Sequence, residues 1–315
     1  MKQENKYPVI IVAGPTASGK SSLALDLALV FDGVVINADS MQVYQDTPII
    51  AACPSAEDKA QVPHKLYEIY DAGANGTVVD WLEKAVAEIR QAWQEGKMPV
   101  VVGGTGLYLD NLINGTTPIP EADSQIRTKV RNLLDEIGVQ ALHEKLRLVD
   151  KESSDRLSPN DTTRVTRAYE VFLQTGIPLS DWHKKPMIKK LPEARFTVVK
   201  ICPQSKELDE RCYLRFDKML AAGALDEIRR LAARRLAPDL PAMKALGVPE
   251  LLAYLRGEIS LEEAVKLGKL HTRQYAKRQR TWFAGKLKAD ICLNECYNGQ
   301  KNLINDVKKA LLVLH

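Results

Sequence analysis

The sequence predicts an α/β fold in which helices cover both faces of a parallel sheet, joined to a helical insertion and a helical C-terminal region. Short apolar runs rich in β-branched residues alternate with segments of helical periodicity in the first part of the chain, which is the pattern of a covered parallel sheet. The stretch from Asp123 to Gln174 has helical periodicity and no strand candidate. A strand returns at Phe196–Ile201, and after Pro203 the chain is almost all helical.

Short segments of the chain are predicted individually as strands and helices. The strands are Pro8–Ala13, Val34–Asn37, a weaker candidate at Lys65–Tyr70, Met98–Val102 and Phe196–Ile201. The helices are Gly19–Phe31, Val78–Glu95, Glu207–Leu236, Pro249–Gly257 and Leu261–Lys288, the last with Ser260 as its N-cap. A Pro-rich break lies at Thr116–Glu121. We therefore expect an α/β core over 1–116, a helical insertion over 117–190, and a return to the core with C-terminal helices over 191–315.

Composition narrows the class of protein. With 45% apolar and 27% charged residues and a net charge of +4, the chain has the composition of an ordinary globular protein, so any nucleic-acid site must concentrate its positive charge locally. Five cysteines without a C-x-x-C pair argue against a disulfide framework, and Cys292 and Cys296 lack the partners of a zinc site. The N-terminal segment resembles neither a signal peptide nor a membrane span. We expect a cytoplasmic protein without a membrane partner.

The segment Gly14–Ser21 matches the phosphate-binding pattern G-x-x-x-x-G-K-[ST] and lies between a predicted strand and a predicted helix, as a P-loop requires. Its glycines let main-chain N–H groups surround an anion at the helix N-terminus. Lys20 would meet the terminal phosphate and the Ser21 hydroxyl would bind Mg²⁺. The residues predicted to bind phosphate are Gly14, Thr16, Ala17, Ser18, Gly19, Lys20 and Ser21. The motif predicts an enzyme with a P-loop NTPase-like sheet and a polyphosphate or diphosphate substrate.

Two more segments follow predicted strands and belong to the same edge of the sheet. Asp39 comes just after Val34–Asn37, where a carboxylate could hold metal or act as a general base; capping a helix is the alternative. Thr105 lies in a Gly-Gly-Thr-Gly segment after Met98–Val102, where the glycines allow a ligand to approach the main chain. Thr105 could also simply cap the next helix.

Basic residues cluster on predicted helices. Arg211 and Arg215 are four residues apart, so both can face a diphosphate or, alternatively, both can lie on a solvated face. Arg273, Lys277 and Arg280 form one stripe without intervening acidic residues, and unpaired basic stripes near Tyr and Trp suit a nucleic-acid backbone. A similarly polar and basic run, Asn160–Arg167, precedes the helical run Ala168–Leu173.

Taken together and in this order, seven segments resemble the bacterial tRNA dimethylallyltransferase family. They are GPTASGKS, NADSMQVY, PHKL, GGTGLY, NDTTRVTRAYEVFLQTGIPLS, RFDKMLAAG and TRQYAKRQRTWF. The resemblance extends from Val9 to about Phe283.

The resemblance implies transfer of a dimethylallyl group from dimethylallyl diphosphate to N6 of adenosine 37, beside the tRNA anticodon. Asp39 would then be the general base, Thr105 would position the amine and diphosphate, and Arg215 would hold the diphosphate with Lys20, Ser21, the P-loop main chain and Mg²⁺. Residues implied to contact the tRNA anticodon stem-loop are Asp39, Ser40, Met41, Gln42, Arg127, Thr163, Arg164, Val165, Thr166, Arg167, Lys244, Arg273, Lys277 and Arg280. We expect a monomer.

The sequence departs from the family pattern at several places. Residues Gln45–Pro54 replace a usual basic residue and I-G-T-A-K-P stretch, Lys65 replaces a second His, and Gly247 is followed by Val-Pro. Three other functions stay open. A kinase is favoured by the P-loop alone; an adenylate isopentenyltransferase would prenylate a free nucleotide; an RNA-binding P-loop protein would use nucleotide only as a switch.

Overall fold

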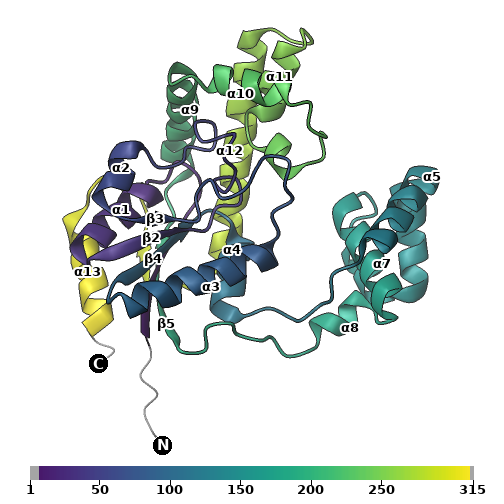
Figure 1. Ribbon diagram of the computed structural model, residues 1–315, viewed down its shortest axis with the longest axis horizontal. Helices are drawn as coiled ribbons and strands as arrows, with labels where there is room; N and C mark the ends of the chain where they lie inside the picture. Colours follow the sequence, from purple (N-terminus) through teal and green to yellow (C-terminus); the bar gives the residue numbers. More distant parts are fainter. Residues whose placement is uncertain (1–6, 313–315) are drawn as a thin grey trace, which may run out of the picture. The chain divides into compact units, whose positions relative to one another are not determined.

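The computed structural model describes residues 7–312 and divides them into two compact units (Figure 1). The larger unit comprises the chain up to Ile113 and from Lys190 onward, and the smaller unit is Asn114–Lys189. The larger unit contains the sheet, whereas the described residues of the smaller unit form helices without a named strand. None of the described helices has the length and hydropathy needed to cross a bilayer.

The sheet of the larger unit is parallel throughout its described strands. They are β1 (Tyr7–Ala13), β2 (Gly33–Asn37), β3 (His64–Lys65), β4 (Met98–Gly103), β5 (Ala194–Ile201) and β6 (Ile291–Leu293), in the order β3-β2-β4-β1-β5-β6. The predicted α/β class is confirmed. The strand expected at Lys65–Tyr70 was wrong in extent, because only His64 and Lys65 pair with β2. Strand β6 was not predicted, since three residues are too short to show a period.

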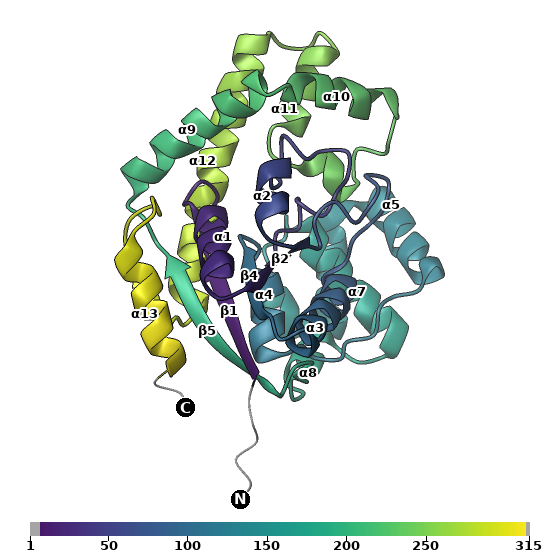
Figure 2. The ribbon, with the colours of Figure 1, turned by 60° about the vertical axis from the view of Figure 1, so that its left-hand side comes forward.

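Alternate residues of the central strand β1 face opposite layers of the core, as strand geometry requires. Val9 and Ile11 belong to the core cluster that includes α3 (Val78–Gln94) and α4 (Gly106–Asn114). Ile10 and Val12 belong to a second cluster, which includes α1 (Lys20–Val30) and α13 (Lys301–Leu312). Figure 2 shows α13 beside β5 and α1 beside β1. Helices therefore cover both faces, as predicted.

The remaining helices of the larger unit follow β2 and β5. They are α2 (Ala56–Gln61), α9 (Ser205–Ala221), α10 (Ala224–Ala233), the 3₁₀ turn η1 (Pro241–Lys244), α11 (Val248–Leu255) and α12 (Leu261–Lys286). The single helix expected over 207–236 was wrong: it breaks at Gly223, whose φ of +97° only glycine adopts readily. Ser260 caps α12 as predicted, because its side chain accepts from the N–H of Glu263 at 3.1 Å.

The smaller unit has its own helical core. Its helices are α5 (Ser124–Val149), α6 (Lys151–Arg156), α7 (Thr162–Thr175) and α8 (Leu179–His183). Asp150 joins two of them, since its carboxylate accepts from the N–H groups of Ser153 and Ser180, each at 3.0 Å. Helix α7 begins at Thr162, within the stretch predicted to be helical, so the basic residues up to Arg167 belong to the same helix as Ala168–Leu173. Asp161 starts this helix by accepting from the N–H of Arg164 at 3.1 Å.

Candidate active site

The P-loop (residues 14–21) joins β1 to α1 in the larger unit. Ala17 and Gly19 both have left-handed main-chain angles, with φ of +63° and +88°. Gly19 is the N-cap of α1 and has no side chain. The first N–H groups of the helix therefore donate to no capping side chain. An anion is the natural partner of such N–H groups. The Ser18 hydroxyl is buried and finds no hydrogen-bond partner among the described residues.

A cavity of about 500 Å³ opens beside the P-loop and is lined by cations. These are Lys20, Arg211, Arg215 and Lys218, and the lining that the structure describes includes no Asp or Glu. The pKa of Lys20 is lowered to about 8, chiefly by burial; nearby Asp39 opposes the shift and Arg215 adds to it. Burial also lowers the pKa of Arg215, whose buried Nε has no hydrogen-bond partner among the described residues. Buried cations short of partners favour a multiply charged anion here.

A second cavity, of about 270 Å³, adjoins Asp39. Its lining combines one carboxylate with apolar and aromatic side chains and with cations. The lining includes Thr16, Asp39, Ser40, Met41, Ile50, Ala51, Arg215, Met219, Lys244, Ala245, Leu246, Thr272, Tyr275 and Arg278. Arg215 lines both cavities. This arginine therefore stands between the cationic cavity and the cavity that contains Asp39.

Asp39 and Thr105 are held together at the ends of β2 and β4. The N–H of Asp39 donates to Asn37 Oδ1 at 2.8 Å, and Asp39 Oδ1 accepts from the N–H of Met41 at 3.0 Å. Thr105 Oγ1 accepts from the N–H of Ser40 at 2.9 Å. Asp39 caps no described helix, since the next one along the chain is α2. Thr105 thus links the two strand ends, and the carboxylate is left to line the second cavity.

Gln279 of α12 links the P-loop to the Thr105 segment, a role that sequence reasoning missed. Its Oε1 accepts from the N–H of Thr16 at 2.8 Å, and its Nε2 donates to the carbonyl of Gly104 at 2.7 Å. A side chain at Gly104 would collide with Gln279 Nε2. Gln279 thus takes the main-chain N–H of Thr16, one of the residues predicted to bind phosphate. The buried face of α12, which also carries Thr272 and Ala276, was the available signal.

The atypical loop at residues 45–54 forms part of the wall of both cavities. Buried Glu227 of α10 accepts from the N–H groups of Ile49 at 2.8 Å and Ile50 at 2.9 Å. Gln42 Nε2 donates to the carbonyls of Ala51 at 3.1 Å and Ala52 at 2.7 Å. Gln42 is among the residues implied to contact tRNA, and its side chain is buried and holds this loop.

The basic stripe on α12 is less free than expected. Arg273 pairs with Asp209 of α9 at 2.7 Å, and Arg280 donates to Ser205. The prediction of an unpaired stripe was therefore wrong for these two arginines, because α9 packs beside α12 and supplies partners that are distant in sequence. Lys277 is exposed on the same helix. Arg278, which was not singled out, lines the second cavity and lies 5.6 Å from the ring centre of Tyr275.

The candidate residues of the smaller unit differ in exposure. Thr163 is exposed, as is Arg164, which pairs with Asp161 at 3.5 Å. Arg127 pairs with Glu121 at 3.0 Å, Arg167 donates to the Pro120 carbonyl at 3.3 Å, and Thr166 is half-buried. Val165, which the family resemblance also implies as a tRNA contact, has a side chain that is fully buried in the core of this unit.

The residues beside the P-loop could supply only a small part of the coordination shell of Mg²⁺. Ser21 is exposed, lines the first cavity and offers one hydroxyl oxygen, a hard donor that suits Mg²⁺. Across residues 7–312 no three His, Cys, Asp or Glu side chains gather as a metal site. Substrate phosphate oxygens and water would therefore supply the other ligands.

Comparison with known proteins places this geometry in a family. The model of the IPP transferase family matches residues 42–286. The tRNA dimethylallyltransferase of Rhodopseudomonas palustris (strain BisB18) is 49% identical over 278 residues, which are 88% of each chain. That of Gluconobacter oxydans (strain 621H) is 50% identical over 276 residues, 87% of this chain and 82% of the relative. The chain belongs to the tRNA dimethylallyltransferase family.

Solved structures of the tRNA dimethylallyltransferase family share the fold. A eukaryotic dimethylallyltransferase solved while acting on tRNA superposes with a TM-score of 0.81 and 29% identity, over 96% of this chain and 77% of that one. The tRNA isopentenylpyrophosphate transferase of Staphylococcus epidermidis superposes with a TM-score of 0.70 and 31% identity, over 98% and 100% of the two chains. The predicted family, fold class and enzyme class are thus confirmed.

Proposed function

We propose that this chain transfers the dimethylallyl group of dimethylallyl diphosphate to N6 of adenosine 37 in tRNA and releases diphosphate. The observation that carries the proposal is the joint placement of Lys20, Arg215 and Asp39. A cationic cavity and a cavity with a carboxylate share one guanidinium. A kinase would need an acceptor close to a terminal phosphate, whereas here an apolar cavity adjoins the anion site.

The first cavity is suited to the leaving group. Lys20, Arg215 and the free N–H groups at the start of α1 would bind the diphosphate oxygens, and Ser21 would share Mg²⁺ with them. When bound, Mg²⁺ would neutralise charge on the departing diphosphate. As the carbon–oxygen bond breaks, negative charge grows on the diphosphate, and fixed cations stabilise that change without reorganising. Met41, Ile50 and Met219 would surround the dimethylallyl chain in the second cavity.

Asp39 would accept the proton that the amine loses. The N6 nitrogen forms a bond to the allylic carbon while the diphosphate leaves with the bonding electrons, and a proton passes from N6 to the Asp39 carboxylate. Main-chain donation from Met41 holds that carboxylate in one orientation. Thr105, which fixes Ser40 beside it, would help to position the amine.

Recognition of tRNA would involve both units. A base in an anticodon loop must leave its stack to enter a cavity, and single-stranded loops are where proteins read RNA. We propose these contacting residues: Ser40, Met41, Lys244, Arg273, Lys277 and Arg280 in the larger unit, and Arg127, Thr163, Arg164, Thr166 and Arg167 in the smaller. The proposal includes a cytoplasmic location, where tRNA is modified, and a monomeric protein.

Radiolabelled substrates test the proposal. The protein is incubated with labelled dimethylallyl diphosphate and Mg²⁺, together with either tRNA or AMP, and in a separate reaction with labelled ATP. We expect label on adenosine 37 of tRNA and none on AMP. Label on AMP alone would point to a nucleotide isopentenyltransferase. Phosphate release from ATP without prenylated RNA would contradict the proposal.

A further inference from the structure

The segment after β6, residues 294–300, crosses back to the P-loop, and the range matched by the family model ends before it, at residue 286. The N–H of Tyr297 donates to the carbonyl of Ser18 at 2.9 Å. On the far side of the loop, the Tyr297 hydroxyl donates to Asp26 of α1 at 2.6 Å. Tyr297 is thus hydrogen-bonded both to the P-loop and to α1, the helix that follows the P-loop.

The bond to Ser18 has a consequence for anion binding. A trans peptide is planar, with its carbonyl and N–H pointing in opposite directions. Since the Ser18 carbonyl points to Tyr297, the N–H of Gly19 in the same peptide points away from Tyr297. In a P-loop the inner side, where such N–H groups converge, is where the phosphate binds. Tyr297 therefore orients one of the donors that the diphosphate requires.

The main chain of Tyr297 packs directly against Gly19. A Cβ atom at Gly19 would lie 2.5 Å from the Tyr297 carbonyl oxygen, so the two main chains are in direct contact. The neighbouring Cys296 side chain is fully buried in a small cluster against which Ala17 packs. Ala17 holds a left-handed φ of +63°, a conformation that persists in a non-glycine residue only when its surroundings enforce it.

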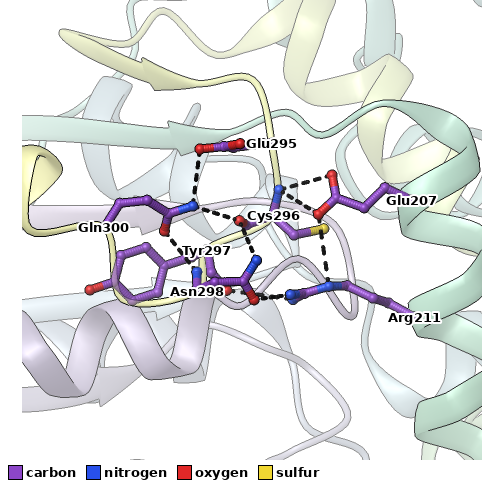
Figure 3. A network of polar contacts seen from close by, with 7 residues as sticks. All are labelled: Glu207, Arg211, Glu295, Cys296, Tyr297, Asn298 and Gln300. Atoms are coloured by element: carbon purple, nitrogen blue, oxygen red, sulfur yellow. Dashed lines mark hydrogen bonds and ion pairs between the residues drawn. The ribbon is translucent and has the colours of Figure 1, made fainter.

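Helix α9 also holds this segment through hydrogen bonds (Figure 3). The carboxylate of Glu207 accepts from the N–H of Cys296, with both oxygens at 3.2 Å. Arg211 donates to the Tyr297 carbonyl at 3.5 Å and also to Asn298 Oδ1. Arg211 thus faces the first cavity while its guanidinium is engaged by the C-terminal segment. Glu207 and Arg211 are therefore bonded to the residues that contact the P-loop.

We propose that residues 296–298 form a strut that positions the P-loop for diphosphate, with Tyr297 and Arg211 as positioning residues. This inference rests on the proposed function, which makes diphosphate the ligand. The strut keeps the Gly19 N–H directed at the anion and keeps Ala17 in its left-handed conformation. Loss of the strut weakens diphosphate binding and leaves tRNA binding unchanged, because the strut touches the P-loop and not the proposed tRNA-contacting residues.

The test measures two affinities on the full chain. Titration calorimetry with inorganic diphosphate and Mg²⁺ reports the P-loop, and a filter-binding assay with unmodified tRNA reports the other substrate. Two substitutions weaken the strut: Asn298→Ala removes an acceptor of Arg211, and Tyr297→Pro removes the N–H that binds Ser18. Asn298→Asp keeps an acceptor for Arg211. Asn302→Ala, the same truncation at an exposed position on α13, is the matched control.

We expect Asn298→Ala to weaken diphosphate binding by about fivefold, the effect of one lost hydrogen bond. Tyr297→Pro should weaken it further, Asn298→Asp should restore it, and Asn302→Ala should leave it unchanged. Affinity for tRNA should stay constant throughout. Unchanged diphosphate binding in both Asn298→Ala and Tyr297→Pro would overturn the strut. An equal loss of both affinities together with a lower melting temperature would show a general structural role and overturn it as well. If the unmodified protein binds diphosphate but prenylates no RNA, the proposed function fails while the strut stands.

Discussion

At the scale of single residues, the site depends on charges whose partners are incomplete. Lys20 is 6% exposed, and both Arg215 and Asp39 lie close enough to Lys20 to shift its pKa. A buried lysine and a half-buried arginine near one carboxylate leave positive charge in excess. A bound diphosphate would supply the missing negative charge, and the carboxylate beside it would remain free to accept a proton.

Replacing Asp39 by Asn tests its proposed role as a base. The amide keeps an acceptor for the N–H of Met41 but cannot take a proton from N6. We expect kcat to fall by about 10²- to 10⁴-fold, the usual contribution of a general base. Dimethylallyl diphosphate should bind with nearly unchanged affinity. Single-turnover kinetics and calorimetry measure the two quantities, and an unchanged kcat would remove Asp39 as the base.

The lowered pKa of Lys20 predicts how diphosphate binding depends on pH. In the free protein Lys20 loses its proton above about pH 8, whereas a bound anion favours the charged form and raises the pKa. Binding then takes up a proton, so affinity should be constant below pH 8 and fall by up to about tenfold per pH unit above it.

Lys20→Arg is the control for this pH dependence. The guanidinium stays charged over the same range, so its affinity for diphosphate, even if lower, should not fall between about pH 8 and pH 10. Calorimetric titrations with dimethylallyl diphosphate measure both profiles. A fall of the same size in Lys20→Arg would assign the effect to another group.

At the scale of elements, the site is assembled by α10 and α12, which lie far from the P-loop in sequence. Gln279 of α12 bonds to the segments that follow β1 and β4, and Glu227 of α10 bonds to the loop after β2. Each contributes one buried polar side chain that satisfies main-chain groups. Because those main-chain groups are buried, removing their hydrogen-bond partner costs more free energy than the hydrogen bond itself contributes to stability.

Gln279→Ala should separate positioning from folding. The substitution frees the N–H of Thr16 and the carbonyl of Gly104, so the P-loop and the Thr105 segment can shift relative to one another. We expect kcat/KM for dimethylallyl diphosphate to fall by about tenfold. Gln279→Glu keeps the acceptor for Thr16 but loses the donor to Gly104, and it should retain more activity than Ala. Equal activity of the two variants and the unchanged protein would contradict the role.

Glu227→Ala should loosen the loop at residues 45–54. The N–H groups of Ile49 and Ile50 lose their acceptor, and we expect a loss of about 2 kcal/mol in the free energy of unfolding. Urea denaturation measures it. Asp226→Ala, at the preceding and exposed position, is the control and should unfold like the original protein. A loss no larger than that of the control would show that the loop needs no such anchor.

At the scale of the whole molecule, the modest net charge of +4 conceals local concentrations of basic groups. Lys218 and the two arginines line the first cavity, while Lys277 is exposed on α12. An RNA backbone releases counterions from each phosphate that a cation contacts, so tRNA binding should weaken as salt increases.

Lys277 and Arg273 should differ in this salt dependence. Lys277→Ala should lower the slope of log K against log salt by about 1, as expected for one lost phosphate contact. Arg273→Ala should lower it less, because Arg273 is already paired with Asp209. Filter binding of tRNA at several salt concentrations measures the slopes. Equal slopes for Lys277→Ala and the original protein would exclude Lys277 from the interface.

The sequence by itself determined the features that contiguous residues encode. A strand, a glycine-rich turn and a helix in register define the P-loop, alternating apolar runs define a parallel sheet, and Asp39 and Thr105 follow strands that end at one edge. These depend on local main-chain geometry and on periodicity, which a linear pattern displays. The ordered motifs also identified the family before any contact was known.

Only the tertiary structure decided which side chains meet. The bond from Thr16 to Gln279 spans 263 positions in sequence, and the bond from Tyr297 to Asp26 spans 271. The tertiary structure also showed that Arg273 is paired with an acidic residue, that the side chains of Val165 and Gln42 are buried, and that Arg215 lines two cavities. Such contacts depend on how helices pack against the sheet, and packing between distant segments leaves no periodic trace in the sequence.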